Sequence, residues 1–250
     1  GYKVKDVKVN GKSVGAVKGA EITIEAVVKA NQVFDSWTVE QGDVTPTDGT
    51  NVKTTFTMGE KEVVITANYK NLHKITVHGD AGDDSYTETI LNAKEGAKQE
   101  ITAKEIAGKR FDKWVVNAGN LTLSDDEAKE NPLVIDAMPD SDLDLTAKYV
   151  DLYALTVDNG TAYDKDNYTA DEAAAGDSIT VEADKLTGLE SFVGWKLKAG
   201  TINEITIKGE TVSVSTDADG YLVDEYGNKI TAEAFTFTMP AGKVELQAVT

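Results

Sequence analysis

Every tryptophan and every methionine of this 250-residue chain falls in one of two motifs, and each motif occurs three times. Each tryptophan follows a phenylalanine by three positions, in the pairs Phe34–Trp37, Phe111–Trp114 and Phe192–Trp195. The methionines lie downstream of these pairs, at Met58, Met138 and Met239. Upstream of each pair a glycine precedes an alanine by seven positions, at Gly19, Gly96 and Gly176. Rare residues in one fixed order indicate tandem copies of a small unit.

The motifs divide the chain into residues 1–70, 71–150 and 151–250, called segments 1, 2 and 3 below. Tryptophan and methionine are 21 and 24 positions apart in segments 1 and 2, but 44 apart in segment 3. The extra residues, about 201–234, contain turn formers between apolar residues and predict an inserted β-hairpin. We also predict short linkers near residues 70–72 and 149–152, where a protease would cut first.

Alternating apolar and polar residues predict β-strands through most of each segment. Ile22, Ile24 and Ala26 alternate with polar residues, and so do Val63, Ile65, Ala67 and Tyr69. One polar face is typical of an antiparallel sheet with one buried side. Helix signals are weak, and only residues 87–95 and 169–175 have the composition for one or two turns. The predicted fold class is mainly β: three tandem small antiparallel-sheet domains, β-grasp-like or a small β-sandwich, with room for one short helix per copy.

The Phe-x-x-Trp motif requires an irregular strand if both rings are buried. Residues three apart face opposite sides of a regular strand, so the strand must bend or bulge between them. We interpret the three tryptophans as core residues rather than as platforms that stack on sugars. Segment 2 has Asp136 where the other segments have Phe56 and Phe237, and a strand shifted by one residue would turn Ile135 inward.

In this order the motifs resemble the divergent internalin B-repeat, a repeat of bacterial surface proteins. Segment 1 carries the resemblance in Phe34-Asp-Ser-Trp37, Thr55-Phe-Thr-Met58 and Val63-Val-Ile-Thr-Ala-Asn-Tyr69. Corresponding motifs in segments 2 and 3 extend it over nearly the whole chain. The resemblance implies a β-grasp fold and an extracellular, cell-surface location, in an anchored or secreted protein of Gram-positive type. It also implies a non-catalytic role as a spacer or an adhesion module.

Composition excludes several classes of function. A formal net charge of −18 and a single arginine, Arg110, exclude nucleic acid as a partner, because phosphate binding requires clustered lysine and arginine. The chain has no cysteine, which excludes disulfides, thiolate nucleophiles and cysteine-based metal sites. No apolar run approaches the length of a membrane span, so we expect no membrane insertion within these residues. We expect a monomeric piece of a longer protein.

Candidate chemical sites are few. His73 and His78 lie five positions apart, so on a regular strand they face opposite sides and cannot bind one metal ion. The segment from Asp164 begins like a calcium-binding loop, but Thr169 replaces its turn glycine. Asp217-Ala-Asp219 has its glycine two positions too early, and a looser calcium site in the acidic loops stays open. We predict no catalytic residue, no cofactor, no metal site and no enzyme.

Tyr221 and Tyr226 in the insertion are the predicted partner contacts, because insertions in repeat arrays map to loops on one face. The partner would be a host protein, a cell-wall protein or a glycan. An alternative function is a carbohydrate-binding segment of a surface-anchored, glycan-active enzyme. An alternative role of the insertion is to extend or shield a sheet edge. In either case segment 3 is expected to fold without residues 210–231.

Overall fold

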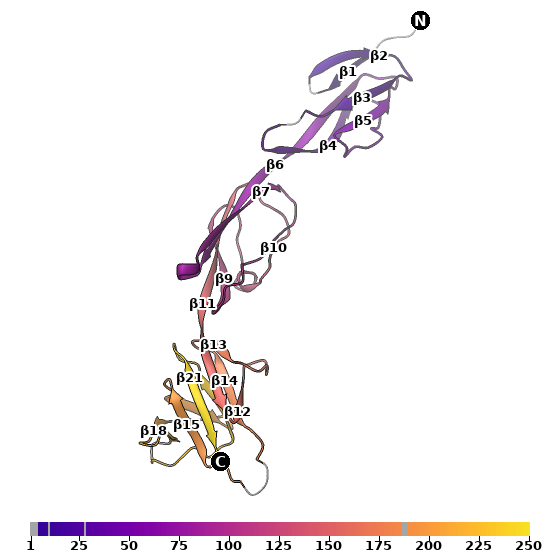
Figure 1. Ribbon diagram of the computed structural model, residues 1–250. Helices are drawn as coiled ribbons and strands as arrows, with labels where there is room; N and C mark the ends of the chain where they lie inside the picture. The colour runs from indigo at the N-terminus through magenta and orange to yellow at the C-terminus, as the bar shows by residue number, and fades with distance from the viewer. Residues whose placement is uncertain (1–4, 10, 28, 187–189) are drawn as a thin grey trace. The chain divides into compact units, whose positions relative to one another are not determined.

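The computed structural model describes residues 5–9, 11–27, 29–186 and 190–250 (Figure 1). These residues form β-strands and two short 3-10 helices, and they contain no α-helix. The chain separates into two compact units, which are described individually. The first contains the residues up to Asp80, Ser85–Ala103 and Lys113–Ala147, and the second contains Ala81–Asp84, Lys104–Asp112 and Lys148–Thr250.

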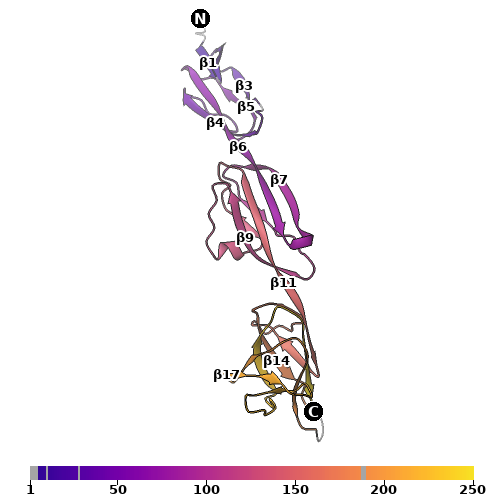
Figure 2. The same ribbon diagram turned by 90° about the vertical axis from the view of Figure 1, so that its left-hand side faces the viewer.

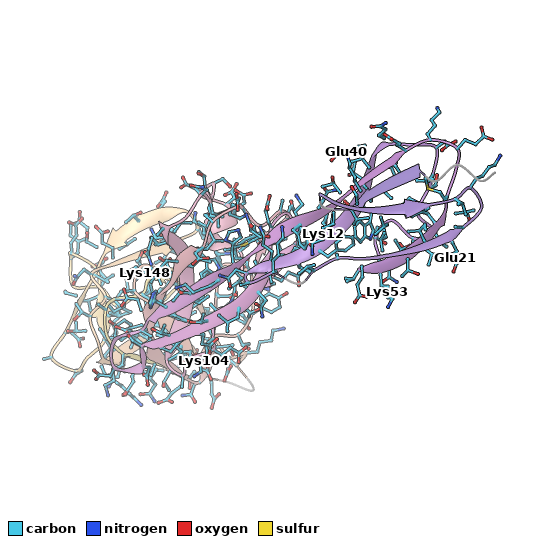
Figure 3. The ribbon with its side chains drawn as sticks, turned by 90° about the horizontal axis from the view of Figure 1, so that it is seen from above. Lys12, Glu21, Glu40, Lys53, Lys104 and Lys148 are labelled. Atoms are coloured by element: carbon cyan, nitrogen blue, oxygen red, sulfur yellow. The ribbon has the colours of Figure 1, made fainter. Side chains whose placement is uncertain are left out.

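Segment 1 has two β-layers. The first layer contains, in spatial order, β2 (Lys12–Ala16), β1 (Lys5–Val9), β6 (Val63–Asp80) and β4 (Gln32–Gln41). In this sheet β1 runs parallel to β6, and the outer strands are antiparallel to their neighbours. The second layer is the antiparallel pair β3 (Glu21–Glu25) and β5 (Lys53–Thr57). Charged side chains such as Glu21 and Lys53 point outward from it (Figure 3).

Segment 2 repeats this arrangement. Its first layer contains, in spatial order, β7 (Tyr86–Lys94), β6, β11 (Leu143–Asp158) and β9 (Lys109–Ala118). Figure 2 shows β7 and β9 at the two edges of this sheet. Its second layer is the antiparallel pair β8 (Gln99–Ile101) and β10 (Leu133–Ile135). The short 3-10 helices η1 (Gly82–Asp84) and η2 (Glu127–Lys129) lie in its connections.

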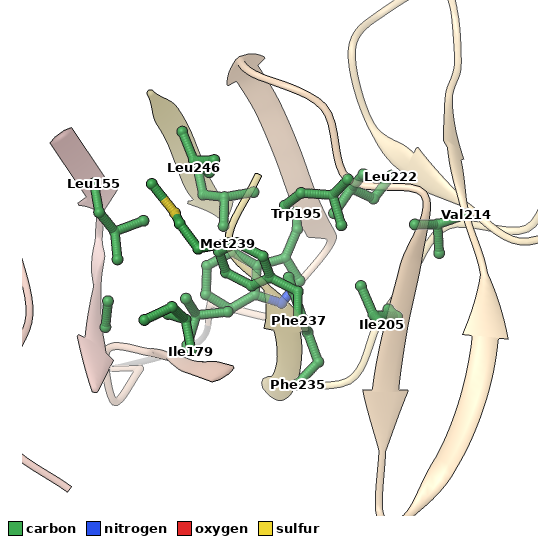
Figure 4. Packing of buried hydrophobic residues seen from close by; sticks show 14 of the residues in the cluster. Leu155, Ile179, Trp195, Ile205, Val214, Leu222, Phe235, Phe237, Met239 and Leu246 are labelled. Atoms are coloured by element: carbon green, nitrogen blue, oxygen red, sulfur yellow. The ribbon is translucent and has the colours of Figure 1, made fainter. Parts of the chain in front are cut away.

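Segment 3 has the same first layer but a larger second one. The first layer contains β13 (Glu172–Ala174), β11, β21 (Val244–Val249) and β15 (Gly194–Ala199), with β11 parallel to β21. The second layer contains β12 (Gly160–Tyr163), β14 (Ser178–Ala183), β20 (Ala234–Thr238), β16 (Glu204–Ile207) and β17 (Glu210–Ser213). A separate pair consists of β18 (Ser215–Thr216) and β19 (Leu222–Val223). Trp195, Phe237 and Met239 pack together in the core (Figure 4).

The mainly β fold class is confirmed, but both helix predictions are wrong. Residues 87–94 belong to strand β7, and residues 169–175 contain a β-bridge at Thr169 and strand β13. A short run of seven to nine residues carries too little periodicity to distinguish a helix from a strand, and the threonines and isoleucine of β7 favour the extended form. Among the described residues no α-helix covers a sheet, as a β-grasp fold would require, and each segment instead has a second antiparallel sheet beside its first layer.

One backbone contact joins the glycine and methionine motifs in all three segments. The N–H groups of Gly19, Gly96 and Gly176 each donate to the carbonyl of the segment's methionine at 2.8 Å. Each methionine N–H donates back to the residue after the glycine. The three glycines have φ between +75° and +92°, which side chains other than glycine rarely adopt. The methionine side chains are at most 2% exposed, so this contact closes the second layer over a buried residue.

The interpretation of the three tryptophans as core residues is confirmed, and the predicted bulge is present in β4. Trp37, Trp114 and Trp195 are 7%, 2% and 0% exposed, and β4 has a register irregularity between Phe34 and Ser36. The bulge lets the Phe34 ring pack on Trp37, with 5.2 Å between the ring centroids.

The predicted strand shift in segment 2 is confirmed as well. Ile135 is 3% exposed and pairs with Gln99, whereas Asp136 is exposed. Gln99 lies three residues after Gly96, and the residue three after Gly19 in segment 1 is Ile22. Ile22 pairs with Phe56, which lies two residues before Met58. Ile135 lies three residues before Met138, so an apolar side chain replaces the missing phenylalanine in the core.

Tyr69 in β6 and Tyr149 in β11 make equivalent contacts in segments 1 and 2. The Tyr69 hydroxyl donates to the Val27 carbonyl at 2.8 Å, and the Tyr149 hydroxyl donates to the Lys104 carbonyl at 2.7 Å. Each acceptor directly follows the alanine of the glycine–alanine motif. The rings of Tyr69 and Tyr149 pack edge-on against the phenylalanine of the aromatic motif, with centroids 6.1 and 6.3 Å apart.

The prediction of short linkers between segments is wrong. Residues 70–72 lie inside β6 and residues 149–152 lie inside β11. An equivalent backbone hydrogen bond is present at each segment boundary. Leu72 N–H donates to the Asn31 carbonyl at 2.8 Å, and Leu152 N–H donates to the Gly108 carbonyl at 2.9 Å. The last strand of one segment continues directly as the first strand of the next, so no turn residues mark the boundary in the sequence.

Replacing Trp114 with alanine should lower the free energy of unfolding of segment 2 by about 3–5 kcal/mol, because it removes a large buried aromatic side chain. Urea unfolding followed by near-UV circular dichroism measures the change. Leu91→Ala is the control, because Leu91 is 67% exposed and should alter stability little. Equal unfolding midpoints for the two variants would show that Trp114 does not stabilise a core.

Trypsin should cut at Lys129 and Lys185 before it cuts at Lys70 or Lys148. The first two lysines are exposed and lie outside strands, whereas Lys70 lies in β6 and Lys148 in β11, where the backbone is hydrogen-bonded. Mass spectrometry of a digestion time course identifies the order of cleavage. Early release of a fragment ending at Lys70 would restore the linker interpretation.

Candidate functional site

The insertion of segment 3 contributes to its core instead of lying on its surface. Six of its apolar side chains are at most 8% exposed: Ile202, Ile205, Val214, Leu222, Val223 and Ile230. A turn at Lys208-Gly209, with φ of +51° and +87°, joins β16 to β17. This burial argues against the expectation that segment 3 folds without residues 210–231, because removing them would uncover the core that Leu222 helps to fill.

The tryptophan ring of segment 3 is hydrogen-bonded to the insertion. Trp195 Nε1 donates to the Ala232 carbonyl at 2.9 Å. In segments 1 and 2 the indole N–H also donates to a backbone carbonyl between the tryptophan and the methionine. Trp37 donates to Asn51, and Trp114 donates to Glu130. A buried indole needs such a partner. The three rings are thus used in packing and hydrogen bonding, which confirms that they are core residues and not exposed stacking platforms.

The two predicted contact residues have different surroundings. The Tyr221 ring is half-buried and lies under two ammonium groups, with Lys229 Nζ 3.4 Å and Lys196 Nζ 4.5 Å from its centroid. Such cation–π contacts hold the β18–β19 turn against β15. Tyr226 is 81% exposed at the tip of the next turn. Tyr226 is therefore accessible to a partner, whereas the face of Tyr221 is already occupied by the two lysines.

The acidic loops use their carboxylates to hold their own backbone. Asp164, Asp217 and Asp224 each accept, at one oxygen, the N–H groups of the residues two and four positions later, at 2.8–2.9 Å. Hydrogen bonds from the side chain and backbone of Asn228 hold the pKa of Asp224 below its usual value. The described residues contain no group of three or more His, Asp or Glu side chains placed to hold a metal ion.

The two histidines face different aspartates. His73 Nε2 lies 3.1 Å from an Asp140 oxygen, and its Nδ1 lies 3.5 Å from Asp142. His78 Nε2 lies 3.3 Å from an Asp144 oxygen. Hydrogen bonds from Asn117 and then from His78 lower the pKa of Asp144. The structure does not bring the two imidazoles to one common ligand position.

A row of hydroxyl side chains crosses the five-stranded sheet of segment 3. Register pairing places one residue from each strand side by side, in the order Tyr163, Thr180, Thr236, Thr206 and Thr211. Their chain neighbours, such as Ile179, Ile205 and Phe237, are buried, so the row lies on the opposite, outward face. We call these five residues the hydroxyl row. Sequence analysis missed it, although threonine at alternate strand positions was a visible signal.

One shallow hollow lies on the hydroxyl row and a second lies beside it. One is lined by Thr180, Thr206 and Thr236 together with residues 231–235, and the other contains Glu204, Ser213 and Thr238. The Oγ1 atoms of Thr180 and Thr236 are 3.0 Å apart. The face is therefore polar and uneven on the scale of small molecules, and it is the candidate interaction surface of the chain.

Residues 5–72 and 74–152 each match the family model of the divergent InlB B-repeat domain. The chain belongs to this family. The matched residues cover segments 1 and 2, where the glycine, tryptophan, methionine and tyrosine contacts are equivalent. A comparison with curated proteins finds no match. Divergent InlB B-repeats are non-catalytic repeat modules and point to a bacterial surface protein. Among the described residues, no helix is long and apolar enough to cross a membrane.

The only arginine of the chain connects the second B-repeat to the turn that follows Gly176. Arg110 donates two hydrogen bonds to the carboxylate of Asp177, at 2.7 and 2.9 Å. Asp177 also accepts the N–H of Ala174 at 3.0 Å. The Arg110 hydrogen bonds are the main reason that the pKa of Asp177 is lowered. This paired geometry is the strong form of a charge-assisted hydrogen bond.

Asp177→Asn should lower the free energy of unfolding by about 1 kcal/mol at pH 7, a modest value because the Arg110 side chain is 51% exposed. The folded-state pKa of Asp177 is lowered, so its stabilisation is present above the unfolded value of about 3.9. It is lost as the pH falls through the folded-state pKa. Thermal melts from pH 7 to pH 2 should show the variant and the parent converging at the acid end. Glu100→Gln, which breaks an exposed pair with Lys98, is the control and should change nothing measurable.

Replacing residues 210–231 with an Asn-Gly turn should prevent residues 151–250 from folding, while the two B-repeats stay folded. The deletion removes four buried side chains: Val214, Leu222, Val223 and Ile230. Amide NMR spectra of the full chain separate the two outcomes, and Tyr226→Ala serves as a control that removes only an exposed ring of the same insertion. Native-like dispersion of the segment 3 signals in the shortened chain would show that the insertion is dispensable.

Proposed function

We propose that the chain is a non-catalytic repeat region of an extracellular, cell-surface protein of Gram-positive type. In this proposal residues 1–70, 71–150 and 151–250 are three copies of one repeat. The B-repeats of segments 1 and 2 act as spacers, and segment 3 also acts as an adhesion or interaction module. The protein is monomeric, and its partner is a host protein, a cell-wall protein or a glycan.

The observation that supports the proposal is that the repeated motif residues are used for packing and for backbone hydrogen bonds. Each tryptophan fills a core, each methionine closes the second layer, and each motif glycine supports the left-handed turn that pairs with that methionine. The tyrosines of the B-repeats are bonded to the backbone of their own copy. Repetition thus reproduces a stable unit, which is what a spacer requires.

Segment 3 is the copy that we assign to interaction. Its insertion adds β16 and β17 to the second layer, which then has five strands, and adds Thr206 and Thr211 to the outward hydroxyl row. Segments 1 and 2 have only two strands at this place. Insertions in repeat arrays often form the binding face, and this one lies on a rigid scaffold.

A carbohydrate-binding segment of a surface-anchored, glycan-active enzyme is the second candidate function. The hydroxyl row favours it, because hydroxyl groups both donate and accept hydrogen bonds and match the groups of a sugar. The two candidates share the surface location and differ in what the rest of the protein does.

Antibodies raised against residues 1–250 should label intact bacteria that express the protein. Labelling of intact cells should equal that of permeabilised cells, because the proposal places the repeats outside the envelope. Flow cytometry measures both, with an antibody against a cytoplasmic protein as the control for cell integrity. Labelling that requires permeabilisation would contradict the surface location.

A further inference from the structure

The hydroxyl row has the extent and the regularity of a binding surface for a polymer. It includes one residue from each of five adjacent strands, and neighbouring strands lie about 4.8 Å apart, so the row spans roughly 19 Å. A second rank beside it contains Ser178, Thr238, Glu204 and Ser213. The sheet holds these side chains at fixed spacing, because the opposite face packs against the core through Ile179, Val181 and Phe237.

The hydroxyl groups of the row retain unused hydrogen-bonding capacity. Only Thr180 and Thr236 are bonded to each other through their side chains. Within the part of the chain that the structure describes, the hydroxyls of Thr206 and Thr211 have no hydrogen-bond partner, and Thr211 is exposed. Each free hydroxyl offers one donor and two acceptor positions at its place in the row. Tyr163, at one end, adds an aromatic ring that can pack on a sugar face.

Charge determines which kind of polymer fits. Segment 3 has 7 lysines against 18 aspartates and glutamates, and Glu182 and Glu204 lie on the same face as the row. The hollow of Thr206 is itself lined by one basic and one acidic residue, Lys208 and Glu233. A polyanion would be repelled. A protein partner would be expected to meet several of the aromatic and arginine side chains that dominate such interfaces, whereas the row has one aromatic residue, Tyr163, at its end and no arginine.

We propose that the hydroxyl row of segment 3 binds a neutral polysaccharide chain, whose hydroxyl groups pair with Thr180, Thr236, Thr206 and Thr211. This inference rests on the proposed role of segment 3 as an interaction module and names its ligand class. The carboxylates of Glu182 and Glu204 accept hydrogen bonds from sugar hydroxyls at the border of the row. The insertion serves this site through β16 and β17 rather than through the Tyr221 and Tyr226 turns.

The test uses the whole chain and two insoluble neutral polysaccharides, chitin and cellulose, in co-sedimentation. Soluble hyaluronate, a polyanion, is offered in a parallel affinity-electrophoresis arm. The main variant is Thr180→Val, Thr206→Val and Thr236→Val together, which removes hydroxyls but preserves shape and strand propensity. The matched control is Thr23→Val with Thr55→Val, because these residues pair across β3 and β5 in the same way.

We expect the parent chain to bind chitin or cellulose and the triple variant to lose affinity by about tenfold or more, since several hydrogen bonds are lost. The control variant should bind like the parent, and hyaluronate should not retard any of them. Near-UV circular dichroism verifies folding. If the triple variant is misfolded, Thr211→Lys decides instead, because it alters only the exposed end of the row.

Three results would overturn the proposal. The first is a parent chain that binds neither polysaccharide. The second is equal affinity of the folded triple variant, or of Thr211→Lys, and the parent. The third is loss of binding in Tyr226→Ala with the row intact, which would locate the contact in the turn. None of these bears on the surface labelling of intact cells, so the location of the repeats stands or falls separately.

Discussion

Strand β6 belongs to two cores at once, and this sharing constrains the register of the first compact unit. Val63, Ile65 and Ala67 lie in the core of segment 1, and Ile75 and Val77 are buried in segment 2. Side chains alternate strictly along a strand, so a shift of one residue would turn both apolar sets outward. Each segment therefore stabilises the register of its neighbour. β11 has the same division, with Leu145 and Leu155 each at most 3% exposed.

The residues with the strongest local constraints were predictable from sequence. The buried tryptophans, the bulge after Phe34 and the inward shift of Ile135 follow from side-chain size and strand periodicity alone. A further signal was overlooked: a glycine follows each tryptophan by five positions, at Gly42, Gly119 and Gly200. Each has positive φ, and a Cβ atom there would come within 3.0 Å or less of the chain that leads into the final strand. No side chain fits this approach, so the glycine marks the crossing of two strands.

What sequence could not supply is the relation between strands far apart in the chain. The sequence predicts a linker at each segment boundary because two alternating strands joined end to end have the same pattern as two separate strands. The hydroxyl row has the same origin, since Thr180, Thr206 and Thr236 become neighbours only through pairing. Tyr221 and Tyr226 were recognisable as insertion residues, but the lysines that cover Tyr221 come from β15 and from the following turn. The contacts of the two tyrosines depend on how the insertion folds onto β15, which the sequence pattern does not indicate.

The insertion unites the packing and the proposed function of segment 3. Its buried residues, among them Ile205 and Leu222, support the sheet from inside, and its strands β16 and β17 widen the same sheet outside. A binding surface on strands is held more firmly than one on a loop tip, because the core fixes each side chain in place. Tyr226, at 81% exposure, has no such support. The physical argument therefore favours the strand-borne Thr206 over the turn-borne Tyr226 as the residue through which the insertion acts.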